Sequence, residues 1–171
     1  ASRFKQRGAS VVVQCHSRLH KLILASEVVD AVVDESANNV RADFYEWLMS
    51  CPGKLHLEAD DVPATKSWLS LPEIPDGKWK ELLPQDDRLK VGIHFQGSPD
   101  FPHDQFRSLA LSHFKPLWER DDVALVSIQK GHGVEQLEGL SDSEVIALGD
   151  TLDTGEHAFA DTARCIHELD V

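Results

Sequence analysis

The stretch VGIHFQGSPDFPHDQFRS, residues 91–108, decides the fold predicted for the second half of the chain. It begins as an apolar strand, passes through Gly97 into a polar loop and reaches Arg107 and Ser108 just before an apolar, helix-like segment. A second apolar strand, ALVSIQ at 124–129, follows that segment. Strand, helix and strand in this order predict a parallel β-α-β unit, whose ligands collect beyond the carboxyl ends of the strands. The loop after the first strand is therefore the first candidate for a binding site.

The first half of the chain repeats the same order of elements. The β-branched segment SVVVQC at 10–15 predicts a buried strand, and DAVVD at 30–34 predicts its returning partner. Between them, Ser17 is expected to be the N-cap of a helix whose apolar residues follow helical spacing over 19–23. A further short element is expected within residues 43–49. Two separate parallel units are thus predicted.

The helices of the second half have their own boundary signals. The first strand is LKVGIHF at 89–95. Because proline is tolerated only in the first turn of a helix, Pro116 makes Ser112 the expected N-cap of the helix that follows the loop. That helix is expected to bury Phe114, Leu117 and Trp118. A final helix is expected to bury its apolar residues, namely Phe159, Ala163, Ile166 and Leu169.

Prolines and irregular polarity between residues 52 and 84 separate the two units and predict loops and turns. We therefore divide the chain into residues 1–80, a linker at 81–88 and residues 89–171. The predicted fold class is α/β, with two Rossmann-like lobes that are each built on a parallel sheet.

Charge and cysteine content exclude several classes of partner. The 171 residues include 17 Lys and Arg against 29 Asp and Glu, a net charge of −12 that repels nucleic acids and anionic membrane surfaces. No apolar run is long enough for a membrane span. The three cysteines, Cys15, Cys51 and Cys165, share no CxxC spacing, which indicates a reducing, cytoplasmic location rather than a disulfide framework.

The loop at 97–108 has the chemistry of a phosphate site. Gly97 permits close approach of a ligand, and Ser98 lies beside it, while Arg107 and Ser108 supply a forked cation and a hydroxyl group. Residues 88–130 carry six basic and five acidic side chains, whereas 131–171 carry one arginine and ten acidic ones. An ordinary β-α loop with a surface arginine is the alternative, because no GxGxxG or Walker motif is present.

Other polar residues have simpler explanations beside the functional ones. His103 and Asp104 could act on a sugar or base as general catalysts, or belong to a solvated turn. His94 lies within the predicted strand and could face either the core or the cleft, and packing in the core is favoured. Cys15 with its neighbouring histidines, His16 and His20, lacks the second cluster that a metal site requires. We therefore predict no metal and no cofactor, and assign no catalytic residue.

The residues that follow carry a resemblance to a known family. The runs LKVGIHFQGSPDFPHDQFRSLALSHFKPL, VALVSIQKG and FADTARCIHELDV resemble the glycosyltransferase-like domain found behind TPR repeats in bacterial proteins, a group similar to glycosyltransferase family 9. RGASVVVQCHSRLHKLI and ADFYEWLMSCPGKL resemble its first lobe. Phe95 stands where the family has Trp, and Ser98-Pro99 where Asn-Pro is common.

The resemblance implies a GT-B fold, in which two Rossmann-like lobes face a cleft and the C-terminal lobe binds a nucleotide-sugar donor. Gln129 and Lys130, within SIQKG, would then line the cleft with His103 and Asp104. The family has further elements before Ala1 and after Val171, including a Gly-Asp loop and the donor clamp. We therefore expect two incomplete lobes: residues 1–80 from the acceptor side and 89–171 from the donor side.

Two functions from different classes remain open. One is sugar transfer from a nucleotide-sugar donor to an unknown acceptor. The other is a non-catalytic binding or scaffold module of a protein with a TPR domain. If the chain comes from such a transferase, it lacks the second half of the donor clamp, so we expect it to bind donor weakly and to transfer no sugar in isolation. We also expect the isolated chain to expose apolar surface that favours association.

Overall fold

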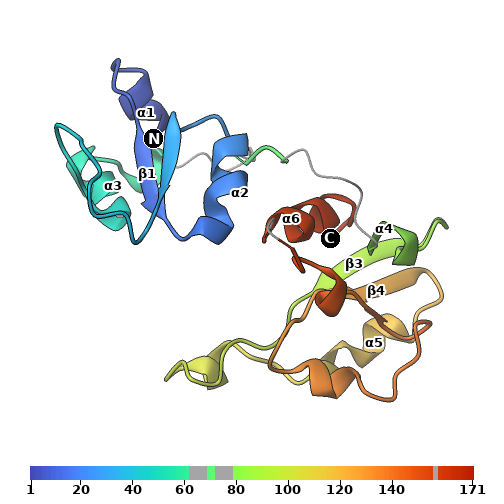
Figure 1. Cartoon of the computed structure of the whole chain (residues 1–171). Coiled ribbons are helices and arrows are strands. Elements are labelled where there is room, and N and C mark those ends of the chain that lie inside the picture. The colour runs from blue at the N-terminus through green and yellow to red at the C-terminus, as the bar shows by residue number, and fades with distance from the viewer. Residues whose placement is uncertain (62–68, 72–78, 156–157) are drawn as a thin grey trace. The chain divides into compact units, whose positions relative to one another are not determined.

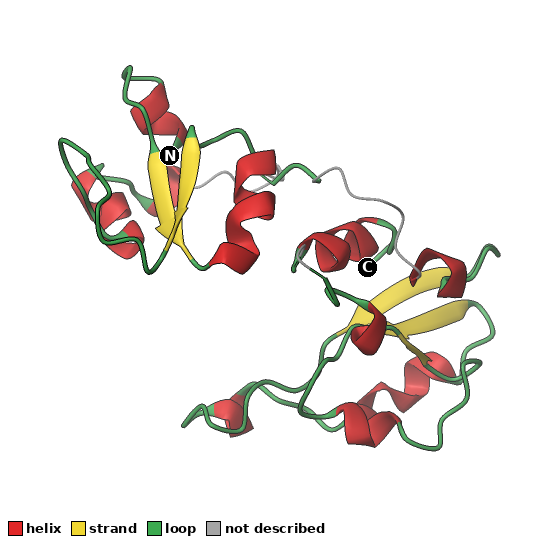
Figure 2. Cartoon of the chain, in the orientation of Figure 1, coloured by secondary structure: helices red, strands yellow, loops and turns green. Residues whose placement is uncertain are grey.

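The computed structural model describes residues 1–61, 69–71, 79–155 and 158–171. These residues form a mixed α/β structure with two small parallel sheets (Figure 2). The chain divides into two compact units, residues 1–70 and residues 71–171. This confirms two separate parallel β-α-β units.

The first unit is a β-α-β motif extended by short helical turns (Figure 1). Its strands are β1 and β2, which pair in parallel from Val12 with Ala31 to Cys15 with Asp34. Its elements are α1 (Ser2–Lys5), β1 (Val12–Cys15), η1 (Ser17–Leu19), α2 (His20–Ala25), β2 (Ala31–Asp34), η2 (Leu48–Ser50), α3 (Cys51–Lys54) and η3 (Ala59–Asp61).

This first unit has a sparse core. Among its described residues only Ser26 and Val29 are buried, with 7% and 6% of their surface exposed. Five apolar residues within 44–49 are instead 75–93% exposed: Phe44, Tyr45, Trp47, Leu48 and Met49. Apolar surface of this kind is the physical basis for the expected association, which stays a prediction.

The second unit carries the larger sheet. Its strands run in the order β3-β4-β5, and both pairs are parallel. Its elements are α4 (Trp79–Leu82), β3 (Leu89–Ile93), η4 (Asp104–Phe106), η5 (Leu111–Phe114), α5 (Lys115–Trp118), β4 (Val123–Ser127), η6 (Val134–Leu137), β5 (Ile146–Ala147), η7 (Gly149–Thr151) and α6 (Ala160–His167).

Apolar layers cover both faces of the second sheet. Every residue of β4 is buried, which is the pattern of a central parallel strand. On one face Val126 packs with Trp79 of α4 and Cys165 of α6. On the other face Leu125 packs in a cluster that includes the partly buried Leu117 and Trp118 of α5. Helices therefore lie on opposite faces of the sheet, as Figure 1 shows for α5 and α6.

Strand β3 is paired along both of its edges. On one side it forms the ladder with β4. On the other side the Gly92 N–H donates to the Val171 carbonyl at 2.8 Å, and the Val171 N–H donates to the Lys90 carbonyl at 3.3 Å. This is the hydrogen-bond pattern of a parallel pair. The chain thus winds from β3 to β4 through α5, and returns after α6 to the opposite edge of β3.

Both predicted N-caps are wrong by one or two residues. His16, rather than Ser17, precedes the first helical turn, and its side chain accepts the Arg18 N–H. Ala110, rather than Ser112, precedes η5, and α5 then begins at Lys115. A 3₁₀ turn ahead of each helix moves the start of helical structure towards the N-terminus. Pro116 does lie in the first turn of α5, as predicted.

The predicted buried face of the last helix is also wrong in part. Phe159 and Ile166 are about half exposed, whereas Ala160 and Cys165 are fully buried. Beyond the end of α6, the Leu169 side chain lies so close to β3 that a Cβ on Gly92 would overlap it. Burial raises the pKa of the Cys165 thiol to about 11, which keeps it protonated at neutral pH.

The boundary between the units lies nearer the N-terminus than residue 80. Trp79 is completely buried in the second unit, where it packs with Leu83 against β4. The segment 81–88, expected as a linker, starts within α4 and belongs to that unit. Much of the proline-rich stretch, at 62–68 and 72–78, lies outside the described residues.

The close contact between Gly149 and the backbone of Gln129 provides a test of how η7 packs against the end of β4. A Cβ at this position would overlap the carbonyl oxygen of Gln129, where the turn η7 meets the end of β4. We expect Gly149→Ala to lower the free energy of unfolding by about 1–3 kcal/mol or more, because backbone has to move. Gly155→Ala, whose Cβ would meet no atom within 4 Å, is the control. Urea denaturation followed by circular dichroism measures both, and equal stability of the two variants would contradict the packing.

Candidate functional site

The loop at 97–108 leaves the carboxyl end of β3, the strand that is paired on both edges. In open parallel sheets this is the topological switch point, where ligands bind in the crevice outside the strands. Figure 1 shows the loop, coloured yellow-green, extending away from the sheet. The structure thus puts the predicted loop where the fold favours a ligand.

Four residues of this loop form a hydrogen-bonded cradle: Gly97, Asp104, Arg107 and Ser108. The Gly97 N–H donates to the Ser108 hydroxyl oxygen at 2.9 Å. That hydroxyl donates to Oδ2 of Asp104 at 2.7 Å, and Nε of Arg107 donates to Oδ1 of Asp104 at 3.1 Å. The structure therefore brings together three of the predicted phosphate ligands, and Asp104 supplies an anion among them.

Gly97 allows the close approach that the sequence predicted, but the atoms that approach belong to the protein. A Cβ here would overlap Oδ1 of Asp104 and lie 2.5 Å from a terminal guanidinium nitrogen of Arg107. Any larger residue would therefore push the carboxylate and the guanidinium group away from the loop backbone.

Asp104 is ionised within the cradle. The hydrogen bond from Ser108, then the hydrogen bond and charge of Arg107, hold the pKa of its carboxyl group below the usual value. The carboxylate balances the charge of the guanidinium group, whose side chain remains 53% exposed. At neutral pH the guanidinium group of Arg107 is therefore already paired with a carboxylate of the same loop.

Two other predicted residues lie on the outer part of the loop. The Ser98 hydroxyl accepts the Asp100 N–H at 3.3 Å within an exposed turn. His103 is exposed, and its ring lies 6.1 Å from that of Phe101 and 6.2 Å from that of Phe106. These three rings form a group that the sequence analysis did not single out.

Gln129 is a buried structural residue. Only 2% of its surface is exposed. Its Oε1 accepts the Phe95 and Gln96 N–H groups at 3.0 Å, and its Nε2 donates to the carbonyls of Gln96 and His132. The side-chain amide therefore joins the strand ends of β3 and β4, and all of its hydrogen-bonding groups are in use.

Further polar side chains strengthen the same edge of the sheet. Nε2 of Gln136 donates to Oε1 of Gln96 at 2.8 Å, and Oε1 of Gln136 accepts the Leu111 N–H at 2.9 Å. Nζ of Lys130 donates to the Leu152 carbonyl at 2.7 Å. Sequence reasoning missed the roles of Gln96 and Gln136, because spacing does not indicate which strand-end amides meet.

The packing predicted for His94 is wrong. This residue is exposed, because it alternates with the buried Ile93 and Phe95 and points to the other side of the chain.

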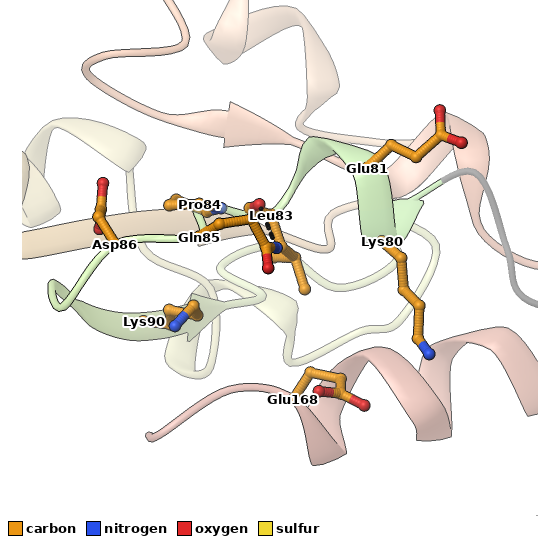
Figure 3. Close-up of a pocket in the computed structure, with 8 residues that line it drawn as sticks. All are labelled: Lys80, Glu81, Leu83, Pro84, Gln85, Asp86, Lys90 and Glu168. Atoms are coloured by element: carbon orange, nitrogen blue, oxygen red, sulfur yellow. Dashed lines mark hydrogen bonds between the residues drawn. The ribbon is translucent and has the colours of Figure 1, made fainter.

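A pocket of about 580 Å³ lies at the opposite end of the second sheet, where the strands begin. Figure 3 shows the side chain of Lys80 extending from α4 towards α6, and Glu168 directly follows that helix. The lining combines two lysines with three acidic residues and lies near the start of β3; it comprises Lys80, Glu81, Leu83, Pro84, Gln85, Asp86, Lys90 and Glu168. A pocket of mixed charge at the amino ends of the strands does not favour binding of a diphosphate.

Polar residues lie at the carboxyl ends of the strands of the first sheet. Nε2 of His16 lies 4.0 Å from a carboxylate oxygen of Glu35, and a ring nitrogen of His20 lies 3.1 Å from the Cys15 carbonyl. Burial, then the charges of Asp34 and Glu35, raise the pKa of the Cys15 thiol. No group of three or more potential metal ligands occurs among the described residues.

Comparisons with known proteins add no relative. A scan against protein-family models, a search of curated proteins and a search of solved structures each found no match. In the described parts of the chain, no helix has the length and apolar character needed to cross a membrane.

The four hydrogen bonds of the Gln129 side-chain amide, which we call the amide clamp, predict that replacing this residue lowers the stability of the fold rather than removing a ligand contact. Gln129→Leu would leave two backbone N–H groups and two carbonyls without their partner, so we expect the free energy of unfolding to fall by about 2–4 kcal/mol. Gln105→Leu, on the exposed part of the loop, should leave stability nearly unchanged. Chemical denaturation of both variants measures this, and an undiminished Gln129→Leu stability would contradict the assigned role.

Proposed function

We propose that this chain is part of a glycosyltransferase-like protein of the GT-B type, and that the loop at 97–108 holds the diphosphate of a nucleotide-sugar donor. The supporting observation is the cradle at the carboxyl end of β3, in which Arg107 and Ser108 already bind a carboxylate. Groups that hold one anion through charge-assisted hydrogen bonds can hold a phosphate oxygen in its place. The acceptor, a TPR partner and a cytoplasmic location belong to the same proposal.

The chemistry of sugar transfer explains why such a cradle would be useful. When the sugar leaves the donor, negative charge develops on the diphosphate. A fixed guanidinium group, a hydroxyl and backbone N–H groups stabilise that charge, and the forked geometry of arginine suits two phosphate oxygens. In this account Asp104 fills the cradle before the donor binds, and the phosphate displaces it.

A scaffold or binding module without turnover is the second candidate. It is favoured by the internal neutralisation of the cradle, because Asp104 leaves the loop stable without any ligand. The two candidates differ in the ligand that they require: the first needs a nucleoside diphosphate in the cradle, and the second does not.

Arg107 carries the first test. We expect Arg107→Ala to weaken nucleoside diphosphate binding by about 1.5–3 kcal/mol, roughly ten- to hundredfold, the value of a hydrogen bond to a charged group. Arg107→Lys should recover only part of this loss, because a point charge cannot make the paired contact. Calorimetry with several nucleoside diphosphates measures the affinities.

The matched control is Arg120→Ala. Arg120 also pairs with a nearby carboxylate, with 2.8 Å from its Nε to Oδ1 of Asp122, but it precedes β4 at the other edge of the sheet. Affinity should be unchanged in this variant. Equal affinities of wild type and Arg107→Ala would remove the loop from the donor site, and sugar transfer by these 171 residues alone would overturn the expectation of an inactive chain.

Asp104 carries the second test. Asp104→Asn keeps the shape of the side chain but removes the charge that competes with a phosphate, so we expect tighter binding of a nucleoside diphosphate. Asp122→Asn, at the opposite edge, should have no effect. Weaker binding in Asp104→Asn would show instead that the carboxylate orients Arg107 for the ligand.

A further inference from the structure

We propose that the exposed aromatic rings of the same loop bind the nucleobase of the donor. This inference rests on the proposed function and extends it to a second part of the ligand. The rings belong to Phe101, His103 and Phe106, which we call the aromatic platform. It lies beside the cradle, since Phe106 directly precedes Arg107 in the chain.

The three rings are neighbours in space. The centroids of Phe101 and His103 are 6.1 Å apart with the planes at 77°, and those of His103 and Phe106 are 6.2 Å apart with the planes at 35°. These separations are typical of interacting aromatic pairs. The loop thus arranges its rings as one group rather than as separate surface residues.

The platform is nevertheless open to solvent. Phe106 is 79% exposed and Phe101 is 46% exposed. In the same unit the sheet buries Phe95, and Phe114 packs beside it with ring centroids 6.4 Å apart. Folding of the loop therefore leaves large apolar ring surfaces in water, and a ligand that covered them would gain the free energy of their burial.

The loop backbone holds the platform in place. The Phe101 N–H donates to the Ser98 carbonyl, the Asp104 N–H to the Phe101 carbonyl and the Phe106 N–H to the His103 carbonyl, at 3.0–3.1 Å. The hydrogen bond from the Gly97 N–H to the Ser108 hydroxyl joins the two ends of the loop. Rings on such a fixed backbone lose little conformational entropy when they bind a ligand.

Charge beside the platform indicates the class of ligand. The guanidinium carbon of Arg107 lies 4.5 Å from the centroid of the Phe101 ring, so a cation and aromatic faces are adjacent. A nucleotide joins a phosphate to a flat aromatic base through one sugar. Aromatic side chains stack on any base because every base has a π face, so the platform supplies affinity without selecting one base.

The experiment compares ligands with and without a base. Binding of uridine diphosphate, adenosine diphosphate and inorganic pyrophosphate is measured by calorimetry for wild type, Phe106→Ala and Phe106→Tyr. We expect Phe106→Ala to weaken both nucleotides about five- to a hundredfold and to leave pyrophosphate unchanged. Phe106→Tyr, which keeps the ring, should retain nucleotide binding. Ile166→Ala, which removes a half-exposed apolar side chain from α6, should alter none of these affinities.

Each other outcome overturns the inference. Equal weakening of nucleotides and pyrophosphate would mean that Phe106 only supports the cradle, and unchanged nucleotide binding would place the base elsewhere. In both cases sensitivity of pyrophosphate binding to Arg107→Ala would leave the proposed function standing. No nucleotide binding by wild type would overturn both.

Discussion

The pairing of β3 on both edges is the constraint on which the rest of the second unit depends. With β4 on one side and the last two residues on the other, the chain reverses its winding direction at this strand. The reversal leaves the carboxyl end of β3 open to a loop, while the helices cover the two faces of the sheet. The loop at 97–108 lies at that point because of the topology.

Polar groups at this edge have two distinct tasks. Gln129 is buried and joins the strand ends through four hydrogen bonds, so it fixes the position from which the loop starts. Beyond that clamp, Asp104 and Arg107 neutralise one another near the solvent, and the Ser108 hydroxyl donates a hydrogen bond to the same carboxylate. Because Gln129 fixes the start of the loop while the Asp104–Arg107 pair lies near the solvent, a phosphate can replace the Asp104 carboxylate without disturbing the sheet.

Periodicity predicted the parts of this structure that depend on local sequence. The β-branched runs and the apolar segments around Pro116 indicated both β-α-β units, and the loop after the strand at 89–95 indicated the site. Periodicity could not show that α6 buries Ala160 and Cys165, because that face depends on tertiary contacts such as those of Cys165 with Trp79 and Val126. It also could not show that the amide of Gln129 turns inward, since its partners are distant backbone groups.

The most direct measurement of the central claim is an NMR titration of backbone amides with a nucleoside diphosphate. If the carboxyl edge of β3 is the donor site, the Gly97 amide, which donates to Ser108, should shift most, together with those of Asp104 to Ser108. The amides around Lys80 and Lys90, at the pocket on the amino edge, should stay unchanged. Shifts centred on that pocket, with residues 97–108 unaffected, would contradict the account.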